Sequence, residues 1–236
     1  MWCAAPPNLA TNPALSAYEQ RIIFDLSYAA VIGFTKNTAG DSGVKGHLAN
    51  IDFLYPARWG VIATDVHFFN SSFASMPWGT AGSLRVSYSK DLTDKLALGI
   101  GLYGVVGTGW GLGADIGVLY RFGDLGFAKD SKIGASITGM GKPYNALGGI
   151  KGRDKTSGFP GLFTPRVGFA TTLVAVKNFK LGMNFDLSFP TFQNLVFDTG
   201  LHMMFGEMVT FKTGWNFNLV ETLRHSQSYI PSFGLA

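Results

Sequence analysis

Residues 179–219 constrain the fold most strongly, because large apolar residues occupy every second position in three successive segments. Glycine, serine, asparagine, aspartate and threonine fill most of the positions between them. Successive side chains of a β-strand leave on opposite faces, so a period of two sustained over about ten residues predicts a strand. We expect three consecutive antiparallel strands here, each with one apolar face and one small, polar face.

The polar face distinguishes between a soluble and a membrane protein. A soluble sandwich or barrel exposes that face to water and covers it with lysine and glutamate. Only 14% of this chain is charged, against a typical ~25% in soluble domains. Strands of roughly 9 to 11 residues, apolar outward and polar inward, are typical of transmembrane β-barrels. The mean hydropathy of only +0.19 argues against a bundle of membrane helices.

The same alternation predicts strands along the rest of the chain. Pro56 is expected to interrupt one of them, since proline cannot donate to a strand ladder. The polar turn at residues 90–95 predicts a hairpin, and residues 141–165 predict a long loop. The expected strands are 21–34, 49–55, 59–69, 82–89, 96–102, 112–122, 133–140, 166–174, the three in 179–219, and a last one from residue 229.

These strands predict an all-β fold, an antiparallel transmembrane β-barrel of about twelve strands over residues 21–236. Residues 1–20 precede it. There, the pattern fits a short helical turn with Asn12 as its N-cap and Pro13 in the first helical position, and an unstructured terminus is the open alternative. Residues 1–10 lack the basic start and apolar centre of a signal peptide, so we expect the export signal of such a barrel outside this sequence.

Charged residues at the polar positions of the strands are expected to face the interior of the barrel. Two roles stay open for them: they pair with each other and with the N-terminal segment, or they orient a ligand. These candidates are Asp25, Arg85, Asp115, Arg121, Asp186, Asp198, His202 and Lys212.

Other classes of site lack the required pattern. The four histidines show no metal-ligand spacing and none is expected beside a second ligand, and the single Cys3 excludes a multi-cysteine metal site. Residues 99–104 match GxGxxG, but that motif binds a dinucleotide only where a strand is followed by a helix. Here the residues that follow predict another strand, with several glycines in it. We therefore expect no metal and no cofactor. No nucleophile motif is present, so we expect no enzyme, with a lipase-like Ser–His pair as the open alternative.

The basic balance of the chain also limits its partners. The net charge is +4, but the lysines and arginines are scattered singly and form no cluster or basic helix. This pattern argues against nucleic acid and favours contact with membrane lipids that carry anionic headgroups.

Several short segments resemble one family of outer-membrane proteins. Asn12, Pro13 and Ala14 precede the first strand, as the NPA segment does in FadL-type long-chain fatty-acid transporters and the related PorV-like proteins. The hairpin SYSKDLTDKLALGIGL (87–102), the segment GASITGMGKPYN (134–145) and the re-entry FTPRVGFATTL (163–173) are similar to theirs. The chain is closest in character to the treponemal branch of these proteins.

The resemblance implies a bacterial outer-membrane location and an N-terminal hatch, with residues 1–20, including Asn12, Pro13 and Ala14, inside the barrel. It also implies transport or binding of hydrophobic molecules, long-chain fatty acids in particular. A PorV-like barrel that holds a secreted or surface protein, and a general diffusion porin, are the alternatives. Barrels of this family have about fourteen strands, so we expect this chain to form either a twelve-stranded barrel or an incomplete fourteen-stranded one.

Overall fold

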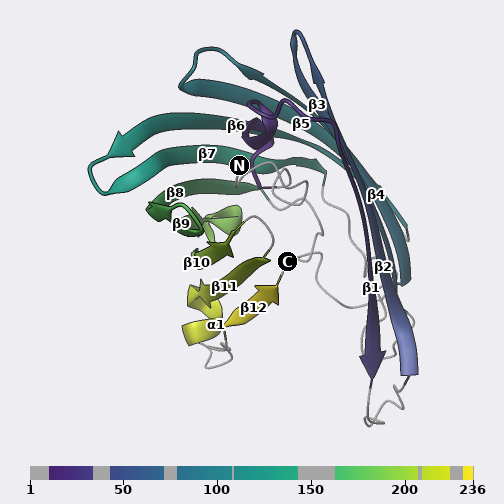
Figure 1. Cartoon of the computed structure of the whole chain (residues 1–236). Coiled ribbons are helices and arrows are strands. Elements are labelled where there is room, and N and C mark those ends of the chain that lie inside the picture. Colours follow the sequence, from purple (N-terminus) through teal and green to yellow (C-terminus); the bar gives the residue numbers. More distant parts are fainter. Residues whose placement is uncertain are drawn as a thin grey trace.

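The structure, a computed structural model, describes residues 11–33, 43–71, 79–107, 109–142, 163–206, 209–223 and 231–235. In this part of the chain, twelve strands form one antiparallel sheet in which each strand neighbours the next in sequence (Figure 1). The prediction of an all-β fold with about twelve antiparallel strands is confirmed. The strands are β1 (Ile23–Gly33), β2 (Gly43–Ala57), β3 (Gly60–Ser71), β4 (Gly79–Asp91), β5 (Leu96–Val106), β6 (Trp110–Leu125), β7 (Ala128–Lys142), β8 (Thr164–Val176), β9 (Phe179–Ser188), β10 (Val196–Phe205), β11 (Val209–Asn218) and β12 (Ser232–Leu235).

Helical structure in the described residues is limited to three short pieces: η2 (Pro13–Ser16), η3 (Pro190–Phe192) and α1 (Leu219–Leu223). None of these helices has the length and apolarity that a helical membrane crossing requires.

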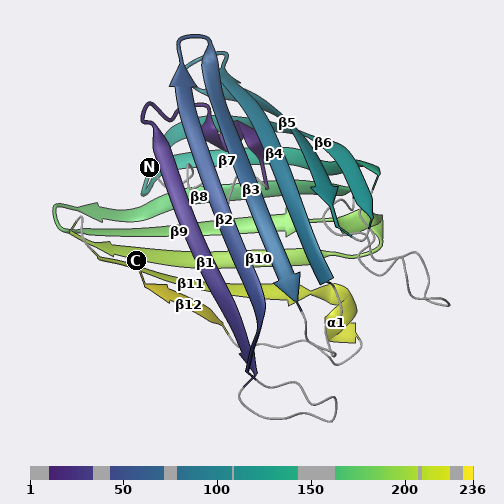
Figure 2. The same cartoon turned by 90° about the vertical axis from the view of Figure 1, so that its right-hand side faces the viewer.

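The sheet curves strongly, so that β1 to β4 face β8 to β12 across an interior space (Figures 1 and 2). β1 and β12 are its two edges, and the described residues show no pairing between them. The sheet is therefore barrel-like but not closed. β12 contributes only four residues, paired with β11 from Phe211↔Leu235 to Gly214↔Ser232, whereas the other strands contain ten or more.

The stretch that the sequence singled out forms three consecutive antiparallel strands, β9, β10 and β11, as predicted. Phe197 lies opposite Leu187 on β9 and Phe217 on β11, and its ring stacks with that of Phe217 at 6.2 Å between centroids. The predicted hairpin turn also agrees, because β4 ends at Asp91 and β5 begins at Leu96. Residues 99–104 lie within β5, and the chain continues into β6, so no helix follows the GxGxxG match.

The prediction that Pro56 interrupts a strand is wrong. β2 runs through Pro56 to Ala57, and a two-residue turn leads into β3. β1 begins its pairing with β2 at Ile23↔Leu54, so Pro56 lies beyond the end of β1 and has a neighbouring strand on one side alone. A missing N–H is tolerated on such an unpaired side.

Several predicted boundaries shift. β7 continues to Lys142 and β8 already begins at Thr164, so both ends of the predicted loop at 141–165 are strand. Residues 143–162 of that loop lie outside the described residues. The last strand begins at Ser232, later than predicted.

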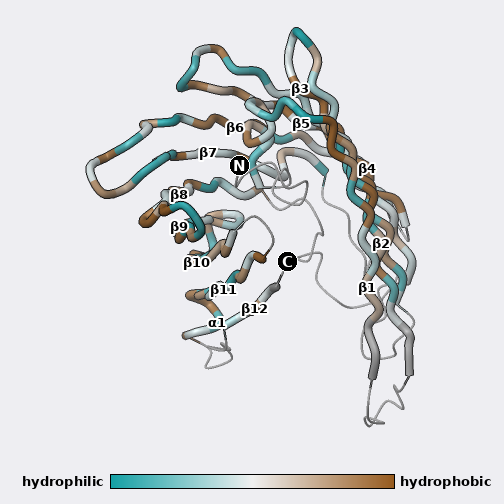
Figure 3. The backbone as a smooth tube through the Cα atoms, in the orientation of Figure 1, coloured by the Kyte–Doolittle hydropathy of each residue, from teal (hydrophilic) through white to brown (hydrophobic). Residues whose placement is uncertain are grey.

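Burial in the sheet is the inverse of that in a soluble protein. The inner face is defined here as the face on which η2 lies, and its buried side chains include Asp52, Asp115 and Ser89. Large apolar side chains on the outer face are exposed, with Leu26 69% and Leu102 66% accessible. Figure 3 shows hydrophobic and hydrophilic residues alternating along the strands. The apolar faces of the strands therefore point away from the interior of the molecule.

Candidate functional site

The N-terminal segment begins the site. Asn12 caps η2 through its side chain, since its Oδ1 accepts a hydrogen bond from the backbone N–H of Ala14 at 2.9 Å. Pro13 occupies the first helical position, where its missing N–H has no partner to lose. The predicted short helical turn, its N-cap and its proline are confirmed. Pro13, Ala14 and Ser16 are all buried.

Hydrogen bonds hold this segment against the inner face of β4 to β7. Asn12 Nδ2 donates to the backbone carbonyls of Val118 and Ala135, at 3.1 and 3.4 Å, so one side chain bridges the β6–β7 pair. The hydroxyls of Ser16 and Ser89 lie 2.7 Å apart, which connects η2 to β4. The backbone carbonyl of Thr11 accepts a hydrogen bond from Ser136 on β7 at 2.6 Å.

Glycines make room for the segment. A Cβ at Gly99 of β5 would collide with the backbone of Pro13 and Ala14, and a Cβ at Gly117 of β6 would collide with the Asn12 side chain. These two glycines lie opposite each other in the β5–β6 ladder. The absence of side chains at paired positions therefore creates the shallow seat in which η2 lies.

The end of the segment makes charged contacts. The guanidinium of Arg121, on β6, lies over the Tyr18 ring at 3.5 Å from its centroid, a cation–π contact. The Tyr18 hydroxyl donates to the Thr93 carbonyl in the β4–β5 turn at 3.3 Å. Glu19 pairs with Arg21 at 3.0 Å, and this hydrogen bond lowers the pKa of the Glu19 carboxyl below its ordinary value.

A cavity of about 480 Å³ lies beside this segment on the inner face. Asn12 and Leu15 form part of its wall, and the remaining walls come from β6 to β11. Its volume falls within the range of roughly 300 to 1,000 Å³ that is usual for small-molecule sites. Three of the charged residues predicted from the sequence, Asp186, His202 and Lys212, line it.

The cavity combines a basic set of charges with an apolar patch. Lys132, Arg166 and Lys212 contribute three cationic groups to its lining, and Asp186 contributes the single carboxylate there. Leu15, Leu119 and Met204 add apolar surface. Such a cavity favours a ligand that has both an anionic group and a hydrophobic part.

Glycines also shape the cavity wall. Gly182 on β9 lies opposite His202 on β10, and a Cβ there would come within 2.6 Å of the imidazole ring. Gly200 likewise accommodates the Asn184 side chain, 2.6 Å from the position of its missing Cβ. Small residues opposite large ones are typical of filled barrel interiors. Here the arrangement lets the His202 and Asn184 side chains lie over the neighbouring glycines where they line the cavity.

The other sequence candidates lie elsewhere on the sheet. Arg85 on β4 pairs with Asp115 on β6 at 3.2 Å, and Asp115 also accepts the Gly139 backbone N–H at 2.9 Å. Asp198 on β10 accepts a hydrogen bond from Asn216 on β11 at 2.5 Å. Asp25 is exposed on β1. The candidates thus separate into a buried ion pair, a contact with the N-terminal segment through Arg121, a group around the cavity, and two residues outside these groups, Asp25 and Asp198.

Two cationic residues of the cavity were missed from the sequence, Lys132 and Arg166. The sequence does indicate that Lys132 faces inward, because it alternates with Gly134 and Ser136, as the inner positions of a strand do. The prediction that no histidine lies beside a second potential ligand is wrong for His67, whose Nε2 lies 2.6 Å from Asp65 Oδ1.

Comparison with known proteins gives no family assignment. No protein-family model matches the chain, and no curated protein matches it.

Proposed function

We propose that this chain forms the barrel of a bacterial outer-membrane protein that binds or transports hydrophobic molecules with an anionic headgroup, long-chain fatty acids being the chemical class that fits best. The membrane part of the proposal rests on the inverted burial. Removing side chains such as Leu26 and Leu102 from water favours insertion by ~25 cal/mol per Å² of apolar surface. Strands of ten or more residues are long enough to span a bilayer.

The cavity beside η2 is the observation that carries the ligand class. A carboxylate placed near Arg166 and Lys212 gains charge-assisted hydrogen bonds, and an acyl chain fits against Leu15 and Leu119. Residues 1–20 act as a hatch in this proposal; residues 1–10 lie outside the described residues, and η2 supports the role because it occupies its glycine seat and forms part of the cavity wall. The resemblance to FadL-type transporters points to the same class of ligand.

A binding assay with matched ligands tests the proposal. The purified chain in lipid nanodiscs is expected to bind palmitate saturably and to bind its methyl ester, which lacks the charge, about tenfold more weakly. Arg166→Gln and Lys212→Gln are expected to weaken palmitate binding by a similar factor. Lys142→Gln serves as the control, since Lys142 lies outside the cavity with its ammonium over the Trp110 ring.

Two results would overturn the proposal. One is the absence of saturable palmitate binding both in the full chain and in a chain without residues 1–20. The other is a large, steady conductance of the full chain in planar bilayers, which identifies a general diffusion porin. Equal binding of palmitate and its methyl ester would contradict the role given to the basic residues.

A further inference from the structure

A row of charged residues crosses the opposite wall of the sheet, on β1 to β4. Four residues on the inner face are successive cross-strand partners: Asp25, Asp52, Asp65 and Arg85. Like charges directly opposite each other in a sheet are destabilising. Arg85 pairs with Asp115 at 3.2 Å, and the basic group beside the three aspartates is His67, whose Nε2 lies 2.6 Å from Asp65 Oδ1.

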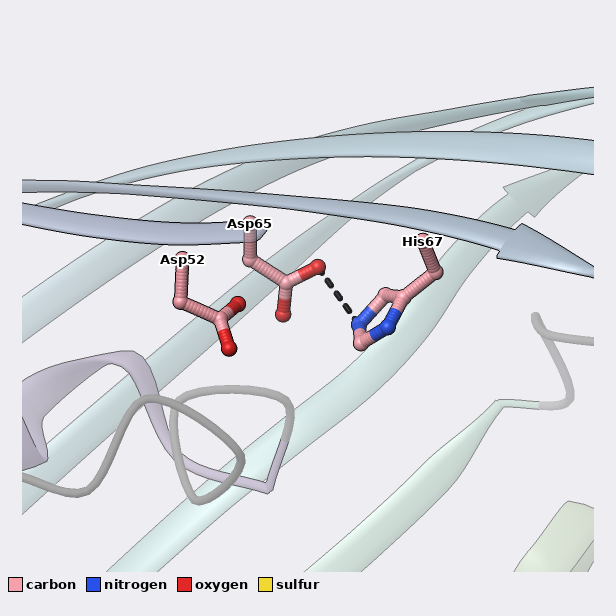
Figure 4. A group of neighbouring side chains, drawn as sticks. All are labelled: Asp52, Asp65 and His67. Atoms are coloured by element: carbon pink, nitrogen blue, oxygen red, sulfur yellow. Dashed lines mark ion pairs between the residues drawn. The ribbon is translucent and has the colours of Figure 1, made fainter. Parts of the chain in front are cut away.

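Two of these aspartates are almost completely buried. Asp52 and Asp65 are each only 2% exposed, and Asp52 Oδ1 and both carboxylate oxygens of Asp65 have no hydrogen-bond partner among the described residues. Asp65 Oδ1 forms an ion pair with His67 Nε2 at 2.6 Å (Figure 4). A buried carboxylate without a compensating charge is strongly unfavourable, so these oxygens favour a positive charge beside them, either a protonated His67 or a metal ion.

His67 completes a cluster of metal-ligating atoms. Figure 4 shows Asp52, Asp65 and His67 on the same side of the strands, with Asp65 in the middle. One oxygen of each carboxylate and one ring nitrogen of His67 all lie within 4.8 Å of one another. The His67 side chain is 35% exposed, which leaves the cluster accessible from the interior space.

The hydrogen bonds behind His67 orient it as a ligand. Asn50 Nδ2 donates to Ser27 Oγ at 3.1 Å, which directs Asn50 Oδ1 toward the ring. This oxygen lies 2.5 Å from His67 Nδ1, so Nδ1–H is the donor in that contact. When Nε2 is unprotonated, its lone pair faces Asp65, where a metal ion can replace the proton of the ion pair. Metal-binding histidines characteristically donate their second ring N–H to such a partner.

We propose that Asp52, Asp65 and His67 bind a divalent metal ion of the borderline class, represented by Zn²⁺. Two carboxylates and one imidazole suit such an ion, whereas Ca²⁺ and Mg²⁺ favour sites made of oxygen alone. Three protein ligands leave the remaining coordination position to water from the interior. The ion neutralises the aspartate row on β1 to β3, and the site is separate from the cavity of the proposed function.

Calorimetry with Zn²⁺ on the full, tag-free chain, stripped with chelator and kept in detergent, tests this site. The expected result is one ion per chain, with at least tenfold weaker binding in Asp65→Asn and in His67→Gln. Asn50→Ala is expected to weaken binding about tenfold, since it removes only the orienting partner and keeps all three ligands. It also provides an answer if a ligand variant fails to fold.

His47→Gln is the matched control. His47 lies on the neighbouring strand β2, and its Nδ1 is 2.6 Å from the Tyr28 hydroxyl, outside the cluster. It is expected to leave Zn²⁺ affinity within about twofold. Absence of saturable Zn²⁺ binding, unchanged binding in His67→Gln, loss of binding in His47→Gln, or tighter binding of Ca²⁺ than of Zn²⁺ would each overturn the proposal.

Discussion

The seat of η2 can be tested by adding one methyl group. In Gly99→Ala, the new Cβ would overlap the backbone of Pro13 and Ala14, with the Pro13 carbonyl oxygen only 2.6 Å away. Carbon atoms in contact normally lie about 3.5 to 4.0 Å apart. The overlapping atoms belong to the backbone and cannot rotate away, so the N-terminal segment must move off the sheet.

The expected magnitude follows from the cost of overpacking. Inserting a methyl group into a filled site typically costs about 1 to 3 kcal/mol, and a collision with backbone belongs at the upper end. A cost of ~3 kcal/mol reduces the ratio of docked to undocked segment about a hundredfold.

Amide hydrogen exchange measures that ratio directly. The backbone N–H groups of Ala14, Leu15, Ala17 and Glu19 are hydrogen-bonded only within the segment, to Asn12, Ala14 and Ser16. A single helical turn is unstable without packing, so these amides are protected only while the segment is docked. Their exchange is expected to accelerate about a hundredfold in Gly99→Ala.

Gly101→Ala is the matched control on the same strand and the same face. Its Cβ would lie 3.5 Å from the nearest atom, an ordinary contact, so exchange in the segment is expected to stay within about twofold of the parent protein. Unchanged exchange in Gly99→Ala, or equal acceleration in both variants, would refute the argument that Gly99 forms the seat.

Two further predictions concern the outer face and the buried ion pair. Ile100→Arg places a charge at an outward position near the middle of β5 and is expected to destabilise the protein in vesicles by about 2 to 4 kcal/mol in denaturant titrations. Phe127→Arg, in the β6–β7 turn, is expected to cost less than about 1 kcal/mol, and equal costs would contradict the membrane orientation. Arg85→Gln leaves Asp115 buried without its cationic partner and is expected to lower the free energy of unfolding by about 3 to 5 kcal/mol. The double variant with Asp115→Asn is expected to recover much of that loss in the same titration. The absence of any recovery would show that the two residues are not coupled.

Local patterns in the sequence predicted much of the structure. Alternation in residues 179–219 determined β9 to β11, because side-chain direction in a strand depends only on position along the chain. The cap of η2 was equally local, since Asn12 and Pro13 act on backbone groups within two residues. For the same reason, alternation placed Asp186, His202 and Lys212 on the face that lines the cavity.

To predict from the sequence that the two aspartates of the proposed metal site are paired, one further fact was needed, the position of the turn between β2 and β3. With Arg58 and Trp59 as a two-residue turn, Asp52 and Asp65 stand at equal distances from it and must lie opposite each other. Treating Pro56 as a strand breaker concealed this register.

The sequence by itself determined the strands, their two chemically different faces and the capped turn before them, because each depends on residues close together in the chain. Only the tertiary structure decided that Gly99 and Gly117 form a seat for η2, that Lys132 and Arg166 share a cavity with Lys212, and that Asp52, Asp65 and His67 converge. These contacts depend on strand register and on the curvature of the whole sheet. Both arise from pairing between distant segments, which no local pattern encodes.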